Sequence, residues 1–595
     1  MAALRSRFFF QDCFRGRHLL KIHLLQQPTP CHHASMDVLR FLFLIVAAVI
    51  RSAWLALRLL GWSASGTSRW LWSVHGRNSR RSGSHGTARF ATRWEMLRHG
   101  TLLGKGPVLG KGRFGRLLRF TSDGLVMVFA ATGAGKGLGI VIPTLLDYRG
   151  SMFVTDPKGE NYAITRRRRG KFGKVYMLNP TDLVHSERFN PLSIIRAGTP
   201  MEADDAGVLA RYMHRPDARE AHWDDRAISL LTAFILHVLH GPPELRTLSR
   251  VRELSIGQAE TMRATLEDIA SSSPALKARE IASGFLGTMP KSDAREAGEF
   301  GSVLANLQKA TEIWSAGSPG GILSSHSTFS LDELVAGTAT LYLCVDEELL
   351  QVYDRWLRVM TGCMLSTVMR AKNLPRRRRK LILMLDEVAA LGPLDVLEKQ
   401  SGLLRAYCTP VLIWQSMNQA LGIYGRDRGQ SLLANASARV FFGVNDNITA
   451  DYVAAMLGNA TILSASEGVS QSSDAWLKQN LSNSRSEGGY PLLDPAEVQR
   501  LAPRRMIIKL RNLPFPVMTG RLNYRRMPRW WGRWDAWRGP VTATGPAAGQ
   551  VSASIAAPVP ALVPAAPAMP PPDVSGPALP PFRRAAPPGQ APAQP

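Results

Sequence analysis

The sequence predicts an α/β protein with an open, largely parallel sheet that an all-α segment interrupts. Two observations support this fold class. Short apolar runs bounded by turn residues recur from residue 124 onward, and helical patterns separate several of them, as expected for buried parallel strands that alternate with helices. Residues 205–335 lack such runs and contain helix-like stretches instead. The expected strands are Leu125–Ala131, Ser151–Asp156, Lys174–Leu178, Thr338–Val345, Leu381–Leu385, Val411–Trp414, Arg439–Val444 and Met506–Leu510, and the helix-like stretches include Asp224–His240 and Val303–Trp314.

The 595 residues are enough for two to four units of ordinary domain size. Changes in composition suggest six segments. They are a basic N-terminal segment (1–61), a basic linker (62–120), the first part of the sheet domain (121–204), an all-α insertion (205–335), the second part of the sheet domain (336–537) and a Pro/Ala-rich tail (538–595). The tail has almost no charge and few large apolar groups, so we expect it to be disordered.

The formal net charge of +27 is unevenly distributed. Residues 1–120 hold twenty Lys/Arg against three Asp/Glu, a net of +17. This concentration favours a basic segment beside an anionic membrane, a polyanion, or both, although an Arg-rich genome composition also contributes.

Residues 38–61 form the one apolar stretch that suggests a membrane helix. Its uninterrupted core, Phe41–Ile50, is followed by Arg51 and Arg58, whereas a spanning helix needs about 20 mostly apolar residues. It therefore predicts a weak span or an interfacial helix, with a signal peptide ranked lower. Twelve Lys/Arg between 62 and 120 favour a cytoplasmic C-terminal side. Met36 is an alternative start of the chain.

The five cysteines stand at positions 13, 31, 344, 363 and 408. They include no CxxC pair, and no histidine cluster completes a zinc site. This usage indicates free thiols in a reducing compartment, so we expect the bulk of the chain to be cytoplasmic.

A glycine-rich turn follows the first expected strand and opens a helix. Its spacing is that of a phosphate-binding loop, G-x-x-x-x-G-K-[ST], with Ala130 at the first glycine position and Gly137 at the hydroxyl position. Backbone N–H groups and the helix N-terminus would bind phosphate oxygens, and Lys136 would reach the β- and γ-phosphates of a nucleotide. The loss of the hydroxyl at position 137 removes a usual Mg²⁺ ligand. The expected nucleotide-binding residues are Thr132, Gly133, Ala134, Gly135, Lys136, Gly137 and Leu138.

Two later strands end in polar residues that complete such a site. The apolar run 381–385 ends in Asp386 and Glu387, the pattern of a Walker B strand. Asp386 is the expected Mg²⁺ residue, and Glu387 the expected acceptor of a proton from the attacking water. The strand before Gln415 would place that amide near the γ-phosphate. Because ligands bind at the carboxyl ends of parallel strands, we expect the three side chains to meet the phosphate loop.

Several segments together resemble the type IV coupling protein family, the TraG-like conjugative DNA-transfer ATPases. The resemblance covers about residues 80–525, in order and at family-like spacing. Its segments are Gly83–Thr92, the phosphate loop, Ile140–Leu146, Val154–Glu160, Arg188–Leu192, Trp223–Asp225, Phe329–Leu334, Leu385–Glu387, Gln415–Ser416 and Arg439–Asp446.

The resemblance implies a RecA-like P-loop ATPase that acts as a homo-hexameric ring, with ATP and Mg²⁺ at the sites above and Gln415 as a sensor. Such rings need an arginine from the neighbouring subunit, and Arg405 and Arg439 are our candidates. The family usually has two N-terminal membrane helices, whereas this chain shows one Arg-interrupted segment. The implied location is the bacterial inner membrane.

The implied function is ATP-driven transfer of single- or double-stranded DNA, with a relaxase or relaxosome, into a type IV secretion channel. Three alternatives remain open: a coupling ATPase for effector proteins without DNA, a non-hydrolysing membrane adaptor and a chromosome-segregating DNA pump. Intact Lys136, Asp386, Glu387 and Gln415 argue against the adaptor.

Three segments are candidates for contact with DNA. The basic runs Arg166–Arg169 and Arg376–Lys380 would suit a channel that binds DNA without sequence preference, or they are ordinary solvated charges. Residues 525–538 interleave Arg with Trp, which suits stacking on bases, a membrane interface or docking to a partner.

Overall fold

The computed structural model describes residues 85–537 and 539, except 103, 113–115, 216–220, 258, 290–293, 372–378 and 472–478. The expected membrane segment 38–61, Cys13, Cys31 and almost all of the tail lie outside the described residues. Among the described helices, none is long and apolar enough to cross a membrane.

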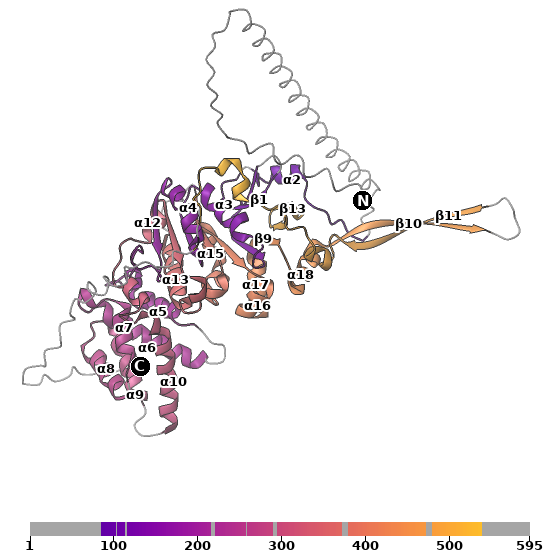
Figure 1. Cartoon of the computed structure of the whole chain (residues 1–595). Coiled ribbons are helices and arrows are strands. Elements are labelled where there is room, and N and C mark those ends of the chain that lie inside the picture. The colour runs from indigo at the N-terminus through magenta and orange to yellow at the C-terminus, as the bar shows by residue number, and fades with distance from the viewer. Residues whose placement is uncertain are drawn as a thin grey trace, which may run out of the picture. The chain divides into compact units, whose positions relative to one another are not determined.

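Eleven strands form one sheet in the order β2-β1-β13-β12-β9-β3-β8-β7-β4-β6-β5 (Figure 1). The seven strands from β9 to β5 are parallel, and the four at the other edge are antiparallel. The expectation of an open, largely parallel α/β sheet is confirmed. The strands are β1 (Val108–Lys111), β2 (Leu117–Arg119), β3 (Leu125–Ala130), β4 (Met152–Asp156), β5 (Lys174–Leu178), β6 (Ala339–Cys344), β7 (Leu381–Leu385), β8 (Cys408–Trp414), β9 (Ala436–Phe442), β12 (Arg505–Leu510) and β13 (Val517–Gly520).

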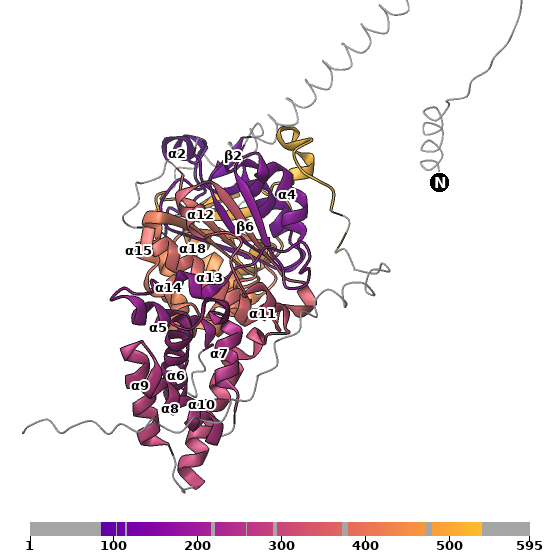
Figure 2. The same cartoon turned by 90° about the vertical axis from the view of Figure 1, so that its left-hand side faces the viewer.

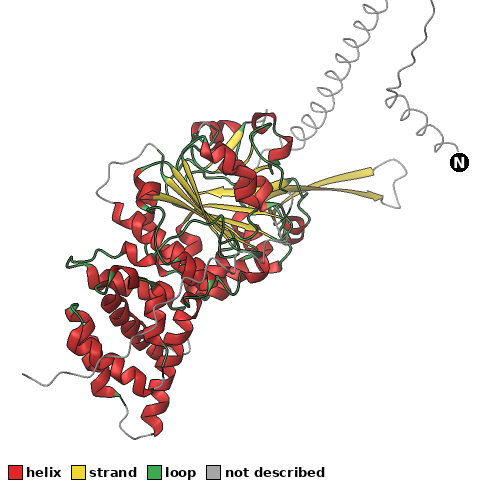
Figure 3. Ribbon diagram, turned by 60° about the vertical axis from the view of Figure 1, so that its left-hand side comes forward, coloured by secondary structure: helices red, strands yellow, loops and turns green. Residues whose placement is uncertain are grey.

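The central strands are apolar throughout because both faces of the sheet are covered. In β3, Met127 and Phe129 face one core, and Val126 and Val128 face another. Helix α3 (Ile142–Asp147) covers the second face, and α13 (Asp354–Arg370) covers the first. Figures 2 and 3 show the helices on both sides of the strands. The phosphate-loop strand is thus fixed between two hydrophobic layers.

The assignment of residues 62–120 to a linker is wrong for residues 87–120. Thr87 forms a bridge with Ala460, α2 spans Arg93–Arg98, and β1 and β2 extend the antiparallel edge through the pairing of β1 with β13. The two strands have only four and three residues. Elements this short do not show a periodic pattern, and their partner strand lies about 400 positions later in the chain.

Between β5 and β6 the described residues contain helices and no strand. They are α5 (Glu202–Met213), α6 (Ala221–Leu239), α7 (Leu248–Ser255), α8 (Ala259–Ser272), α9 (Leu276–Thr288), α10 (Ala294–Thr311), α11 (Pro319–Leu323) and α12 (Asp332–Ala336). Helices α6 to α10 gather in one group (Figure 2). Helix α5 joins this group to the sheet domain because it packs on both α6 and α13.

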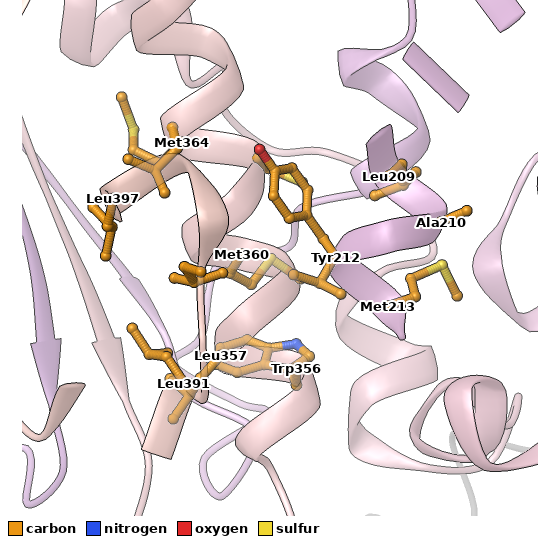
Figure 4. Packing of buried hydrophobic residues seen from close by; sticks show 14 of the residues in the cluster. Leu209, Ala210, Tyr212, Met213, Trp356, Leu357, Met360, Met364, Leu391 and Leu397 are labelled. Carbon is orange, nitrogen blue, oxygen red and sulfur yellow. The ribbon is translucent and has the colours of Figure 1, made fainter. Parts of the chain in front are cut away.

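The contact between α5 and α13 is close and apolar. Tyr212 of α5 lies against α13 beside Met360 (Figure 4). Trp356 and Leu357 of α13 belong to the same buried cluster. A Cβ on Gly362 would lie 2.4 Å from the Tyr212 ring, so only glycine lets the ring approach this turn of α13. The buried Tyr212 hydroxyl also bonds to Ser366.

A long antiparallel ribbon follows α18 (Asn447–Leu457). Its strands, β10 (Asn459–Gln471) and β11 (Gln479–Pro491), pair in register from Asn459↔Pro491 to Gln471↔Gln479. The ribbon extends away from the main sheet (Figure 1). Its described strands pair with each other and with no strand of the main sheet, and Ala460 at its base forms an isolated bridge with Thr87.

The Arg/Trp segment folds back on the sheet domain. Trp530 is fully buried against Ile142, Leu146 and Ile164, the outer surfaces of α3 and α4 (Glu160–Gly170). Arg167 of α4 forms an ion pair with Asp535 at 2.8 Å. Met527 and Trp530 of the segment therefore serve internal packing, whereas Trp531 and the arginines at 525, 526, 529 and 533 are exposed.

Candidate nucleotide site

The phosphate loop begins where β3 ends. Gly133 and Gly135 have φ angles of +76° and +84°, which lie in the left-handed region that side chains avoid. The loop therefore has the backbone that its glycines predict, with N–H groups free to turn toward an anion. Gly443, at the end of β9, also has a positive φ, and a Cβ there would lie 2.6 Å from that of Ala134.

The helix after the loop starts with a wide π turn, Gly137–Val141, before α3. Pro143 explains this start because proline has no N–H and its ring clashes with the carbonyl four residues earlier. The turn carries Lys136 at its N-terminal end, where a helix attracts anions.

The two acids after β7 lie against Lys136. Its Nζ is 3.0 Å from Glu387 Oε2 and 3.3 Å from Asp386 Oδ1. The Asp386 backbone is fixed by its neighbour strand, since Thr155 Oγ1 donates to the Asp386 carbonyl at 2.7 Å. Glu387 has φ +59° and is the only described non-glycine residue with a positive φ. That conformation costs about 1–2 kcal/mol, and such strain concentrates at functional sites.

Gln415 connects the acid pair to the phosphate loop. Its Nε2 donates to Glu387 Oε1 at 2.8 Å, and its Oε1 accepts from Thr132 Oγ1 at 3.2 Å. Gln419, which the sequence analysis did not identify, donates to the same Glu387 oxygen at 3.2 Å. Gln419 lies in the first turn of α16 (Met417–Tyr424). Its position beside Glu387 therefore follows from the helix that begins directly after β8.

The pKa shifts of the three charged groups follow from burial and mutual attraction. Burial lowers the pKa of Lys136, but the charges of Asp386 and Glu387 outweigh it and the net shift is upward. For Glu387, burial raises the pKa, and Lys136 with the Gln415 amide brings the net value below the usual range. For Asp386, burial dominates and its pKa is raised despite Lys136.

These residues line a pocket of about 410 Å³, a size that suits a small ligand. Its lining includes every expected nucleotide-binding residue except Ala134, together with Asp386, Glu387 and Gln415. The structure thus brings the predicted phosphate loop and all three strand-end residues together.

The donor set fits a divalent cation. Asp386 Oδ1 is buried and accepts no hydrogen bond among the described residues, although Lys136 lies within ion-pair distance. A carboxylate oxygen in that position is a ligand that Mg²⁺ prefers. Gly137 contributes no hydroxyl, so Asp386 is the side chain placed to hold the ion.

Another buried acid, Asp156, also lines the pocket. Asp156 ends β4 and accepts from the Tyr162 N–H at 2.8 Å and from Asn161 Nδ2 at 3.1 Å. Burial raises its pKa to about 7. These bonds hold the start of α4, which explains the Asp-Pro-Lys-Gly-Glu sequence as a helix-start structure at the rim. Lys158 pairs with Glu347 at 2.7 Å on the same rim.

The C-terminal segment supplies an arginine that the sequence analysis did not place here. Arg525 lines the same pocket as Lys136. The local signal was the Arg/Trp pattern, but the place of Arg525 at this pocket depends on the path of the chain after β13.

The two arginine candidates for a neighbouring subunit lie outside this pocket. Arg405 is exposed on α15 (Ser401–Tyr407), before β8, and its carbonyl accepts from Lys380, which precedes β7. Arg405 therefore lies near the amino ends of the parallel strands, whereas the phosphate loop lies at their carboxyl ends. Arg439 lies within β9 and bonds to the hydroxyl of Tyr452.

The basic run Arg166–Arg169 is largely used internally. Arg169 is buried and bonds to the carbonyls of Tyr148 and Gly150, and Arg168 bonds to that of Leu146. Only Arg166, over the Tyr162 ring, has no such bond. The second run lies outside the described residues except for Arg379 and Lys380.

The chain has the features of a P-loop nucleotide-binding protein. These are a parallel α/β sheet, a glycine-rich turn between a strand and a helix, and acids at the carboxyl end of a nearby strand. Comparison with known proteins is more specific. The model of the family described as Type IV secretory system Conjugative DNA transfer matches residues 87–544. The chain therefore belongs to this family, and the resemblance found in the sequence is confirmed.

Two curated relatives are similar over most of the described region. Conjugal transfer protein TraG of Agrobacterium fabrum (strain C58) is 31% identical over 432 residues, which cover 70% of this chain and 62% of TraG. Protein VirD4 of the same organism is 29% identical over 454 residues, which cover 74% and 66%. The chain thus spans somewhat less than two thirds of the length of these relatives.

Solved structures support the fold. Plasmid coupling protein TrwB in complex with the non-hydrolysable ATP analogue ADPNP is 16% identical, with a TM-score of 0.54, over 74% of this chain and 95% of that chain. TrwB in complex with ADP and Mg²⁺ has a TM-score of 0.53 at 16% identity, over 73% of this chain and 94% of that chain. The RecA-like P-loop fold implied by the resemblance is confirmed.

Proposed function

We propose that the protein is an ATP-hydrolysing coupling protein that recruits DNA, or DNA with bound protein, and moves it into a type IV secretion channel. One observation carries the ATPase part of the proposal. Lys136, the adjacent Asp386 and Glu387, and Gln415 come from three separate segments and form one connected network in a single pocket.

Each residue has a role that its position supports. Lys136 and the N–H groups of the phosphate loop bind and orient the phosphates. Glu387 accepts the proton of the attacking water, and its lowered pKa keeps it ionised for that task. Gln415 donates to Glu387 and accepts from Thr132, so it positions the base relative to the loop.

Asp386 would hold Mg²⁺, which neutralises charge on the phosphate oxygens. In the nucleotide-free protein, Lys136 compensates both carboxylates. When the triphosphate binds, its phosphates become a new anionic partner of Lys136. Glu387 then keeps only its hydrogen bonds from the side-chain amides of Gln415 and Gln419. Lys136 is therefore the residue whose partners change between the free and bound states.

The family and the printed descriptions of relatives support the rest of the proposal. TrwB is described in complexes with ADPNP and with ADP and Mg²⁺, and one curated relative is named Conjugal transfer protein TraG. We infer a homo-hexameric ring at the inner membrane, with the bulk of the chain in the cytoplasm. In that ring, exposed Arg405 is available to a neighbouring subunit, and relaxase or relaxosome proteins and channel components are the partners.

Coupling of effector proteins without DNA is the second candidate, because the same motor would serve either cargo. A non-hydrolysing adaptor is disfavoured by the complete network around Glu387.

The ATPase proposal is tested with full-length protein by measuring phosphate release for the wild type, Lys136→Ala and Glu387→Gln. We expect Lys136→Ala to lose nucleotide binding, and Glu387→Gln to bind ATP but turn it over roughly 10²–10⁴-fold more slowly. Turnover that survives in both variants would place hydrolysis elsewhere and refute the site.

A further inference from the structure

The segment 525–537 crosses the C-terminal ends of two helices, α3 and α4. Each of these helices follows the carboxyl end of a strand and runs back along the sheet, so both end near the amino ends of the parallel strands. Arg529 of the segment lies 3.3 Å from Asp147, the last residue of α3. Near the end of α4, Arg167 pairs with Asp535. The segment and the two helix ends therefore form one surface, far from the phosphate loop.

Helix α2 belongs to the same surface. Asp147 also pairs with Arg119 of β2, and the backbone N–H of Arg119 donates to the carbonyl of Thr101, just after α2. Figures 1 and 2 both show α2 and the yellow C-terminal segment at one end of the molecule, with helices α6 to α10 at the opposite end. We call the surface formed by α2, the C-terminal ends of α3 and α4, and residues 525–537 the basic face.

The basic face has more cations than its carboxylates neutralise. Each of its carboxylates already pairs with an arginine, and these are Glu95, Asp147 and Asp535. Four further cations are exposed and form no ion pair among the described residues, namely Arg98, Arg149, Lys171 and Arg533. The surface therefore has an uncompensated positive charge that suits an anionic partner.

Three guanidinium groups of this face lie close to one another. Arg168 is held by its Nε, which donates to the Leu146 carbonyl at 3.2 Å, and lies over the ring of Phe172. Burial lowers the pKa of Arg168, and the nearby charges of Arg533 and Arg149 lower it further. Like charges at this spacing repel, so an anion that binds between them is stabilised by all three.

The basic face also exposes large apolar side chains. Trp94 and Leu97 are 81% and 36% exposed, and because they are three residues apart they lie on one side of α2. None of the residues of α2 is buried. At the other end of the face, Trp531 is 63% exposed. Tryptophan beside unpaired arginines is typical of surfaces at a membrane–water interface.

The chain that leads to this face favours a lipid bilayer over DNA as the anionic partner. Residues 62–84 join the expected membrane segment 38–61 to the first described residue, and they contain four arginines and no acid. Such a stretch spans at most about 80 Å, and α2 is the first described helix that follows it. A basic segment beside a membrane helix is attracted to anionic lipids, and the basic face continues that charge.

We propose that the basic face docks on anionic phospholipid headgroups of the inner membrane, with Trp94 and Trp531 at the lipid–water interface and the unpaired cations toward the phosphates. The inference rests on the proposed location of the protein at the inner membrane. It adds to that location the surface by which the folded domain itself contacts the bilayer.

The test uses full-length wild type reconstituted in nanodiscs of phosphatidylglycerol or of phosphatidylcholine, and hydrogen exchange of backbone amides is the readout. Each basic residue near an anionic surface contributes about fivefold to binding. Four such residues favour docking by well over tenfold, so exchange in residues 93–99 and 525–537 should be at least about tenfold slower in phosphatidylglycerol than in phosphatidylcholine. High salt should remove the difference, because it screens exposed charges.

Charge reversal identifies the surface. Arg149→Glu/Arg533→Glu offsets the four unpaired cations, so the slowing in phosphatidylglycerol should fall below about twofold. The matched control is Arg211→Glu/Arg279→Glu, which reverses two exposed arginines of α5 and α9 outside the basic face. This control should keep the full slowing of the wild type.

The outcomes that would overturn the inference are distinct. Equal exchange in the two lipids, or slowing that survives Arg149→Glu/Arg533→Glu, would refute electrostatic docking. Slowing by a DNA duplex and not by phosphatidylglycerol would assign the face to DNA. Wild type that co-migrates with both kinds of nanodisc but shows no slowing would refute the docking surface alone. Wild type that co-migrates with neither would refute the proposed membrane location as well.

Discussion

Replacing Lys136 with methionine should destabilise the nucleotide-free protein as well as abolish ATP binding. The change keeps the apolar stem but removes the one cation beside Asp386 and Glu387, which lies 3.3 and 3.0 Å from their oxygens. The side chains of the two acids are only 11% and 16% exposed, so water cannot replace the lost charge.

The size of the effect follows from the burial of the pair. Removal of one partner from a buried ion pair costs about 3–5 kcal/mol. The Lys136 side chain is 22% exposed, and the two glutamines still donate to Glu387, so we expect a cost at or just below the lower end of that range, roughly 2–3 kcal/mol near pH 7.5.

The pH dependence has a definite sign. The raised pKa of Lys136 means that its stabilisation is present at all pH values below its ordinary 10.5. The lowered pKa of Glu387 contributes stability above its ordinary 4.5 that is lost as the pH falls through the folded value. In Lys136→Met, both carboxylates ionise without a cation. The difference from the wild type should therefore be greatest at pH 7–8 and shrink toward pH 4–5.

The assay is urea unfolding of both proteins between pH 5 and 8 without nucleotide. A matched control, Lys136→Met/Asp386→Asn/Glu387→Gln, removes the unpaired charges and should recover most of the lost stability. A stability difference that stays constant across this pH range, or a control no more stable than the single variant, would refute the electrostatic account.

Three further predictions concern the general base Glu387, the phosphate loop and the C-terminal segment. Glu387→Gln should keep ATP affinity within about twofold while turnover falls; equilibrium binding checks it, and loss of binding would contradict a role limited to proton transfer. Gly443→Ala should cost at least about 1–2 kcal/mol of stability, because φ is +58°, and should weaken ATP binding through its contact with Ala134; unchanged affinity would show that the loop tolerates the shift. Trp530→Ala should cost roughly 3–5 kcal/mol and expose residues 521–537 to proteolysis, and unchanged digestion would contradict the packing on α3 and α4.

Much of the site could be predicted because its chemistry is encoded locally. The strand before the phosphate loop and the strand before Asp386 are continuous apolar runs, and each ends in residues with recognisable spacing. The rule that parallel strands present their carboxyl ends at one edge was then sufficient to bring Lys136, Glu387 and Gln415 together.

The remaining parts depend on contacts between distant segments. Strand β1 is too short to show a pattern, and its pairing partner Gly520 lies at the other end of the domain. Arg169 looks like part of a surface charge run, yet it is buried because nearby carbonyls and Thr340 accept its hydrogen bonds. Arg521 has no local signal at all, since its contact with Gly135 exists only after the sheet has formed.

The most direct test of the central claim is the rate of ATP hydrolysis by the full-length protein with and without single-stranded DNA, measured beside Lys136→Ala. A DNA-coupled motor predicts turnover that DNA stimulates, that rising salt suppresses because phosphate contacts are screened, and that Lys136→Ala abolishes. Turnover that is indifferent to DNA at low salt would contradict DNA transfer and favour a protein cargo.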